Sequence, residues 1–439
     1  MNQVSKRAAL AASGIASAAF VLVFSLGSYK ASYNFAVYTL FGAAMFLGLW
    51  LIIDDGLLFN RRRLAIAIAV VLGAFAVRMC YIDARSGDYN SFLQHWAEFF
   101  RENGGLKAIG EPIGDYNLPY LYLLALISYL PFDDLHMIKL MSVVCDVLLA
   151  FYAMRLTTLV AKNDKAPLAA FLVVLCLPTV FLNSSWWAQC DSIYATFALA
   201  ALYYGLKRRP VLAVLMGTLS FAFKLQAIFI LPIFAVLLMR GDIKWRHVPL
   251  FPTFYALLVL PAVIAGRPPL DALLIYAHQT GEYSSHITLN APTLGTVFKQ
   301  MEDTSGASAF MIILAFVYLA ALLLVAWTRH RRNSLDDRGI LLMALAMAVG
   351  IPFLLPSMHE RYFYLAEILS VVCAAGGLVS FVIPTLVQAA SMICYDAYIT
   401  GYYRLRLGLA TFLMACGAAL IVATLLRCKP EQSDPVRQR

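Results

Sequence analysis

Long apolar stretches separated by short polar segments run along the whole chain. Examples are Leu10–Gly27, Leu64–Met79, Phe310–Trp327 and Leu407–Leu426. Because a helix needs about 20 apolar residues to cross roughly 30 Å of hydrocarbon, stretches of this length predict membrane-spanning helices. We therefore predict an all-α, polytopic integral membrane protein with about 12 to 14 spans. The predicted spans cover residues 8–28, 34–53, 64–82, 137–160, 167–182, 190–206, 211–223, 225–239, 247–265, 307–328, 339–354, 362–378, 379–397 and 405–426.

Composition and charge agree with this pattern. Hydrophobic residues make up 62% of the 439 positions and charged residues 13%, whereas soluble chains carry about 25% charged residues. The net charge of +9 lies in short clusters between apolar stretches, which is typical of cytoplasmic loops. A nucleic-acid partner would need one continuous basic face, so the pattern argues against one. The clusters are Lys6-Arg7, 61–63, 207–209, 240–246, 329–332 and 427–439.

This charge pattern places both termini in the cytoplasm and two long loops outside. We predict a single membrane domain, 1–439. Its Ala- and Leu-rich spans and compact loops favour a bacterial inner membrane, with the endoplasmic reticulum of a eukaryote as the alternative. The domain comprises two extra N-terminal spans (1–63), a core (64–265) with an outer loop at 83–136, a second outer loop (266–306) and the C-terminal spans (307–439).

Some apolar segments are too short to cross a membrane comfortably. Residues 116–131 are Tyr-rich and bracketed by prolines, which favours an interfacial or re-entrant helix on the outer face. The short spans 167–182, 211–223 and 225–239 predict a cavity, since interrupted helices are tolerated where they border one. We expect this cavity to open to the outer face.

Polar side chains gather in four clusters next to the predicted outer face. Any one of them could be a helix cap or part of an interfacial aromatic belt. Together, ionisable groups at one membrane face predict a functional site. The clusters are Gly87-Asp88-Tyr89-Asn90 with Gln94-His95-Trp96, then Gly114-Asp115-Tyr116, then Trp186-Trp187-Ala188-Gln189-Cys190-Asp191, and finally Met358-His359-Glu360-Arg361-Tyr362; Lys224 and Gln226 add a polar turn.

The clusters suit sugar transfer to a hydroxyl group. Such a reaction needs a carboxylate to take the proton of the acceptor, and cations to stabilise a departing phosphate. Asp88 opposite His359, Arg361 and Lys224 would supply both.

At these positions the sequence resembles the GT-C superfamily of membrane glycosyltransferases, in particular the dolichyl-phosphate-glucose glucosyltransferases and GPI-anchor mannosyltransferases. The resemblance covers about residues 64 to 378. The motifs that carry it, in order, are Gly-Asp-Tyr followed by His-Trp, Asp115-Tyr116 before Pro119, Met137-Ile138-Lys139-Leu140 with Asp146, Gln189-Cys190-Asp191, Phe223-Lys224-Leu225-Gln226 with Pro232, and Met358-His359-Glu360-Arg361.

The resemblance implies a GT-C fold and inverting transfer of a hexose, of the mannose or glucose class, from a polyprenyl-phosphate sugar to a glycan or lipid acceptor on the periplasmic face. It implies that Asp88 is the catalytic base and that His359, Arg361 and Lys224 contact the donor phosphate. Asp88 lacks the Asp-x-Asp partner of metal-using members, so we expect no obligatory metal, with His95 the nearest candidate ligand. The expected substrate-cavity residues are Asp115, Tyr116, Tyr89, His95, Trp187, Gln189, Asp191, Gln226 and Glu360.

Two other classes remain open. A transporter or flippase of a lipid-linked sugar would need the same spans and cavity, but would usually show two related halves. An O-antigen polymerase or ligase would use diphosphate-linked glycans and rely on arginines in its outer loops. The sequence identifies neither the sugar nor the acceptor nor the carrier length.

Overall fold

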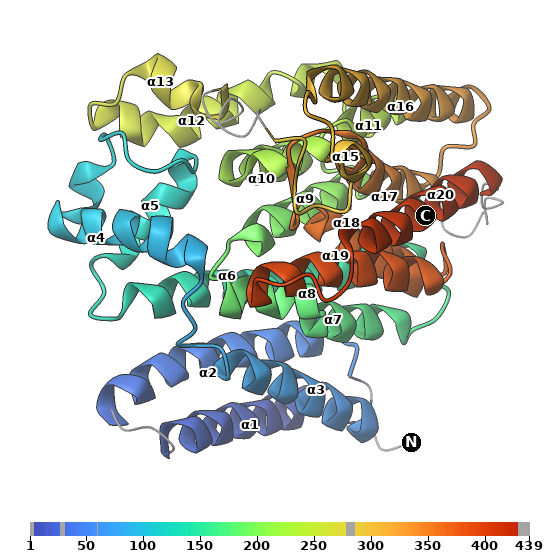
Figure 1. Cartoon of the computed structure of the whole chain (residues 1–439). Coiled ribbons are helices and arrows are strands. Elements are labelled where there is room, and N and C mark those ends of the chain that lie inside the picture. The colour runs from blue at the N-terminus through green and yellow to red at the C-terminus, as the bar shows by residue number, and fades with distance from the viewer. Residues whose placement is uncertain (1–3, 27–30, 59, 278–285, 429–439) are drawn as a thin grey trace.

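The apolar stretches fold into helices that lie roughly side by side, as Figure 1 shows. The computed structural model describes residues 4–26, 31–58, 60–277 and 286–428, and is 75% helical with almost no strand. Eight helices in these ranges are long and apolar enough to cross a membrane, or nine with one bent pair. The predicted all-α polytopic fold is confirmed. The eight are α1 (Lys6–Leu26), α2 (Ala31–Asp54), α6 (Asp134–Val160), η5 (Trp245–His247) continued by α12 (Leu250–Ile264), α16 (Ser305–Arg331), α17 (Asp337–Leu354), α19 (Val382–Thr400) and α20 (Leu407–Arg427).

The other predicted spans fold into helices that are shorter, bent or more charged. Pro178 bends the span after α7 by 47°, because proline disfavours helical geometry in the residue before it. Lys224 and Pro232 likewise separate α10 from α11. α3 is 19 residues long but carries four arginines. These elements are α3 (Arg61–Met79), α7 (Ala166–Cys176), α8 (Pro178–Phe181), η3 (Leu182–Trp186), α9 (Asp191–Leu206), α10 (Pro210–Phe223), η4 (Leu225–Phe229), α11 (Ile233–Arg240) and α18 (Tyr364–Ala375).

Small elements lie between and beyond the long helices; α4, α5 and α13 form one end of the bundle, at the left of Figure 1, whereas α15 lies nearer the centre, against α16 and α20. Among them α5 has ten residues, so it is about 15 Å long and cannot cross the hydrocarbon alone. β1 and β2 pair in parallel, with Leu289 opposite His359. The elements are η1 (Tyr89–Leu93), α4 (Gln94–Glu102), η2 (Gly105–Ala108), α5 (Leu118–Ile127), α13 (Pro269–Leu273), β1 (Thr288–Leu289), α15 (Gly295–Phe298) and β2 (Met358–His359).

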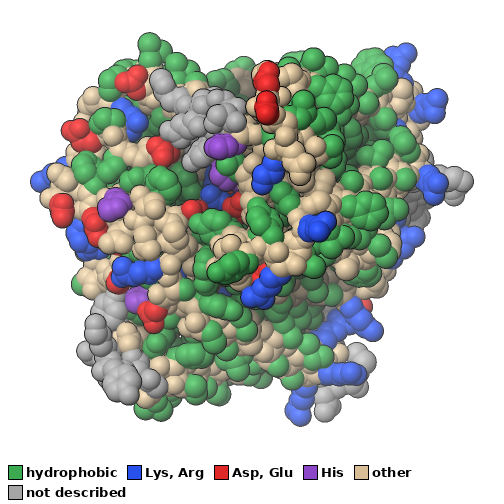
Figure 2. Space-filling view, in the orientation of Figure 1, with side chains coloured by type: hydrophobic (Ala, Val, Ile, Leu, Met, Phe, Trp, Pro, Cys, Tyr) green, Lys and Arg blue, Asp and Glu red, His purple; other side chains and the backbone are tan. Residues whose placement is uncertain are grey.

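Ion pairs join the helix ends at the opposite end of the bundle. Lys6 pairs with Asp54 at 2.6 Å, and Arg240 pairs with Asp337 at 2.6 Å. Figure 2 shows Lys and Arg side chains gathered at this end, near the end of α20. The basic clusters within the described residues therefore lie at one end of the bundle. This is expected if successive predicted spans cross the membrane in alternating directions. Parts of two predicted segments, 278–285 of the second outer loop and 429–439 of the last basic cluster, lie outside the described residues.

The orientation predicted from the basic clusters can be tested by labelling. In a background without the native cysteines, Glu102→Cys should react with a membrane-impermeant thiol reagent in intact cells, and Lys207→Cys should react only after permeabilisation. Both positions are exposed, so access should depend on the side of the membrane alone. The reverse pattern would overturn the orientation, and with it the assignment of the outer face.

Candidate active site

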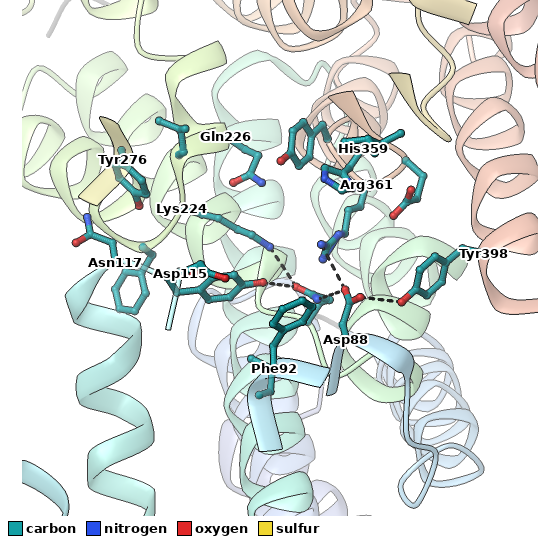
Figure 3. A pocket seen from close by; sticks show the side chains of 18 of the residues that line it. Asp88, Phe92, Asp115, Asn117, Lys224, Gln226, Tyr276, His359, Arg361 and Tyr398 are labelled. Carbon is teal, nitrogen blue, oxygen red and sulfur yellow. Dashed lines mark hydrogen bonds and ion pairs between the residues drawn. The ribbon is translucent and has the colours of Figure 1, made fainter. Parts of the chain in front are cut away.

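A cavity of about 390 Å³ lies beyond the ends of α3, α10 and α17 that point away from the basic clusters. Its volume falls within the range of about 300–1,000 Å³ typical of ligand sites. Figure 3 shows polar side chains from several elements pointing into it. The lining residues are Asp88, Phe92, Leu93, Trp96, Asp115, Tyr116, Asn117, Gln189, Phe223, Lys224, Leu225, Gln226, Tyr276, Leu289, Asn290, His359, Glu360, Arg361, Tyr362 and Tyr398.

The carboxylate of Asp88 is held by donors from three other parts of the chain. Its Oδ2 accepts hydrogen bonds from Trp187 Nε1 at 2.9 Å and from Gln189 Nε2 at 2.7 Å. Its Oδ1 accepts one from the hydroxyl of Tyr398 at 2.8 Å. Nη2 of Arg361 lies 3.4 Å from Oδ2. The side chain keeps 22% of its surface exposed, so it is fixed in place yet open to the cavity.

These contacts keep Asp88 ionised. Burial alone would raise its pKa, but Arg361 and the hydrogen bonds from Tyr398 and Trp187, with a contribution from Lys224, outweigh burial and hold the pKa below its usual range. Hydrogen bonds to the charged form of a carboxyl favour that form. The cavity therefore contains a fixed negative charge throughout the physiological pH range.

Gln189 links this carboxylate to a buried ion pair. Its Oε1 accepts hydrogen bonds from the hydroxyl of Tyr116 at 2.8 Å and from Lys224 Nζ at 3.3 Å, which turns the amide nitrogen toward Asp88. Lys224 in turn pairs with Asp191, whose second oxygen accepts from Asn183 at 2.6 Å. Lys224 and Asp191 are both buried, so each satisfies the charge of the other.

Two π-helical turns position the loops that meet at the carboxylate. η1 begins directly after Asp88, and η3 ends directly before Trp187. Turns of this kind are rare and frequently occur at functional sites. The hydroxyl of Ser86 ties the two loops together, since it donates to the carbonyl of Trp187 at 2.7 Å and accepts from the amide of Tyr89 at 3.1 Å.

Lys139 of α6 binds the segment that leads from α3 to Asp88. Its ammonium group is buried and donates to the carbonyls of Tyr81 at 2.7 Å, Ile82 at 2.9 Å and Ala84 at 2.6 Å. A cation at the C-terminal end of α3 also interacts favourably with the helix dipole. The segment between α3 and Asp88 is therefore fixed to the core of the bundle.

Arg361 leans over the ring of Trp187, with its guanidinium carbon 5.3 Å from the ring centre. Its Nε and Nη1 are buried and meet no acceptor within the described residues. Burial would lower the pKa of Arg361, but Tyr116, Asp88 and the neighbouring carboxyl groups together raise it well above the usual value. Buried N–H groups without an acceptor raise the free energy of the folded protein. An anion in the cavity that accepts hydrogen bonds from this guanidinium group would therefore be bound favourably.

His359 lies beside Arg361 on a short strand, paired with Leu289 and bridged to Asn290. Burial and the neighbouring guanidinium lower its pKa to about 3. The imidazole is therefore neutral at pH 7, and any contact with a donor phosphate would be a hydrogen bond rather than an ion pair. The predicted contact between His359 and the donor phosphate stays a prediction.

Glu360 is buried next to these groups, and burial is the largest cause that raises its pKa from 4.5 to about 7. The carboxyl group of Glu360 therefore loses its proton at a higher pH in the folded state than in the unfolded state. Its contribution to stability is therefore full below pH 4.5 and is lost as the pH rises to about 7.

Glu360→Gln should remove this pH dependence. Relative to the variant, the wild-type protein should lose thermal stability between pH 4.5 and 7, by at most about 3 kcal/mol in free energy of unfolding. Melting curves of both proteins in detergent across this range would check it. A stability difference that stays constant with pH would contradict the raised pKa.

The structure places nine of the thirteen predicted site residues in the cavity wall: Asp88, Asp115, Tyr116, Gln189, Lys224, Gln226, His359, Glu360 and Arg361. Trp187 and Asp191 lie behind the wall and act on it through hydrogen bonds. Tyr89 and His95 do not line it. Tyr89 is buried in an apolar cluster, because it turns inward at the start of the π turn, and His95 lies exposed near Glu98.

Sequence reasoning did not find Tyr398 and Asn290. Tyr398 comes from α19, outside the region of family resemblance, and is one of several tyrosines near the end of that helix. Asn290 is in the second outer loop, where it adopts a left-handed conformation with φ of 59°. Gly114, which was part of a predicted cluster, has a φ of 70°, and a Cβ at this position would approach the ring of Trp96 to 2.9 Å.

We also searched the site for side chains that could bind a metal ion. Among the described residues, no group of three or more His, Cys, Asp or Glu side chains could hold one. The expectation that no metal is obligatory stays a prediction.

Comparison with known proteins gives one family match. The sequence model described as glycosyltransferase family 87 matches residues 116–357, more than half of the chain. The matched segment contains Tyr116, Gln189, Lys224 and Gln226; Asp88 precedes it, and Arg361 follows it. No curated protein matches the chain significantly.

Proposed function

The chain belongs to glycosyltransferase family 87, a family of membrane glycosyltransferases of the GT-C type, and from this we propose that it is an inverting hexosyltransferase that uses a polyprenyl-phosphate sugar. The hexose would be of the mannose or glucose class, and the acceptor a glycan or lipid on the periplasmic face of a bacterial inner membrane. The observation that supports this most is the ionised carboxylate of Asp88, 3.4 Å from the guanidinium of Arg361 in one cavity.

The reaction breaks the bond between the anomeric carbon and the phosphate oxygen, and forms one from that carbon to the acceptor oxygen. The hydroxyl proton passes to Asp88, and the bonding electron pair leaves with the phosphate. Arg361 stabilises the charge that grows on the leaving group. Displacement from the opposite side inverts the configuration at the anomeric carbon.

The lowered pKa of Asp88 makes it a weak base, and this determines when it acts. A free hydroxyl group would not give up its proton to such a carboxylate. The proton becomes acidic only as the new bond places positive charge on the acceptor oxygen. Asp88 would therefore take the proton late, and its main earlier contribution would be to orient the hydroxyl group.

The two oxygens of Asp88 are not equivalent in this respect. Oδ2 already accepts two hydrogen bonds and faces Arg361, whereas Oδ1 accepts one from Tyr398. A carboxylate oxygen has two lone-pair sites, so the proton of the acceptor would go to Oδ1. This puts the acceptor on the Tyr398 side and the donor phosphate on the Arg361 side.

Transfer from a panel of synthetic polyprenyl-phosphate and polyprenyl-diphosphate sugars to membrane extracts, read by mass spectrometry, tests the proposal. We expect a product with inverted anomeric configuration from a monophosphate hexose. Turnover of diphosphate-linked glycans alone would favour a polymerase or ligase. The family match supports glycosyl transfer over transport, since the matching family consists of glycosyltransferases. A transporter would form no glycosidic bond in this assay.

We also expect transfer activity to persist in EDTA, since Arg361 supplies positive charge where metal-using enzymes place a cation. The assay compares rates after chelation and after addition of Mg²⁺ or Mn²⁺ to the chelated enzyme. Loss of activity in EDTA with recovery on addition of a divalent cation would contradict this expectation.

A further inference from the structure

The wall of the cavity contains an amide side chain that has no hydrogen-bond partner in the part of the chain that the structure describes. Gln226 lies in the first turn of η4 and is 9% exposed. Its Oε1 is fully buried and meets no donor, and its Nε2 makes no hydrogen bond within the described residues. In Figure 3 this side chain lies between Lys224 and His359.

This arrangement contrasts with Gln189 in the same wall. The amide of Gln189 uses both of its polar atoms, with two donors on Oε1 and Asp88 on Nε2. Buried polar side chains are almost always satisfied, because an unmet donor or acceptor is unfavourable. An amide that stays unsatisfied at a cavity wall is therefore expected to find its partner in a ligand: Nε2 can donate directly, and a rotation of the side chain would bring the buried Oε1 to the cavity surface.

Asn290 presents a second acceptor of the same kind. Its Nδ2 donates to the carbonyl of Cys394 at 2.9 Å, which fixes the orientation of the amide. Its Oδ1 is buried and meets no donor within the described residues. The left-handed backbone of Asn290 and the bridge to His359 hold it in the wall of the cavity.

The chemistry of these atoms selects one part of a sugar donor. Amide oxygens need hydrogen-bond donors, which a phosphate lacks and an apolar carrier chain also lacks. Hydroxyl groups of a sugar supply them, and the free amide nitrogen of Gln226 can donate back to a neighbouring hydroxyl oxygen. The unpartnered N–H groups of Arg361 require the opposite partner, an anion.

We propose that Gln226, assisted by Asn290, binds hydroxyl groups of the transferred hexose and determines which hexose the enzyme accepts. The inference rests on the proposed function and extends it to the sugar. A site with buried polar groups that are satisfied only by a substrate hydroxyl rejects an analogue without that hydroxyl strongly. Discrimination against one particular deoxy sugar is therefore the expected signature.

The test uses short-chain polyprenyl-phosphate hexoses and their monodeoxy analogues as donors. Wild-type enzyme should lose kcat/KM by about 100-fold or more for at least one deoxy position. Gln226→Met, which keeps the length of the side chain but cannot hydrogen-bond, should show a similar loss with the parent hexose and no further loss with that deoxy sugar. The ratio between the two donors should therefore approach one.

Gln388→Met is the matched control. Gln388 donates to Thr179 at 3.0 Å inside the bundle and does not line the cavity. Its replacement should leave the ratio between parent and deoxy donors as in wild type, even if it lowers thermal stability.

Two results would overturn the inference: equal use of all monodeoxy donors by wild type, or a Gln226→Met enzyme with the wild-type ratio. Failure of the proposed function would look different, since wild type would then transfer from none of these donors. In that case, thermal stabilisation by hexose 1-phosphates and their deoxy forms decides the inference. Stabilisation that depends on one hydroxyl in wild type and not in Gln226→Met would support it, and any other pattern would reject it.

Discussion

Asp88→Asn should lower the rate of glycosyl transfer by about 10²- to 10⁴-fold, the usual contribution of a general base. Asparagine has nearly the same shape, and its oxygen can still accept the hydrogen bonds from Trp187 and Gln189. It cannot take a proton from the acceptor. Expression, melting temperature and donor affinity should therefore stay near wild type, and kcat with a defined donor and acceptor is the quantity to measure.

Asp115→Asn serves as the control, because Asp115 lies exposed at the edge of the same cavity. Its effect should be much smaller. If Asp115→Asn or Asp191→Asn abolished transfer while Asp88→Asn remained active, another carboxylate would be the base. Full activity in all three variants would reject the mechanism altogether.

Arg361→Ala should weaken donor binding by about 2 kcal/mol or more, equivalent to about 30-fold in Kd, because a charge-assisted contact with the phosphate is lost. The guanidinium has two buried nitrogens without an acceptor among the residues that the structure describes, so its removal leaves few protein groups unpaired. Thermal stability should fall little. Equilibrium binding of a non-transferable polyprenyl-phosphate analogue measures the effect apart from catalysis.

Arg361→Lys keeps the charge but not the planar group that binds phosphate through two hydrogen bonds. It should recover part of the lost affinity. An unchanged Kd in Arg361→Ala together with a large loss of thermal stability would show that this residue serves only as the ion-pair partner of Asp88.

The sequence predicted the position of nearly every helix, because apolar length is a property of each segment by itself. It also predicted that Asp88 and Arg361, which are far apart in the sequence, lie at one membrane face. With the basic loops on one side of the membrane, the loops that contain these two residues must lie on the other side. Their contact at 3.4 Å depends in addition on how the two loops fold, which this alternation of sides does not determine.

The direction in which each side chain points was harder to predict. Tyr395 and Tyr398 lie on one helix, yet Tyr395 packs behind Trp187 while Tyr398 bonds to Asp88. Such differences depend on the rotation of a helix about its axis, and a uniformly apolar segment contains little information about that rotation.

The two π turns make the spacing of the site sensitive to chain length. A π turn contains one residue more than an α turn would, so removing one residue would close it to an α turn and displace mainly the residues of the turn itself. A deletion within η1 would therefore move the chain directly after Asp88, and a deletion within η3 the chain directly before Trp187, whose indole N–H now reaches that carboxylate. Single-residue deletions in these two segments should therefore be far less tolerated in evolution than substitutions, and natural relatives that keep the chemistry should keep both turns at the same length.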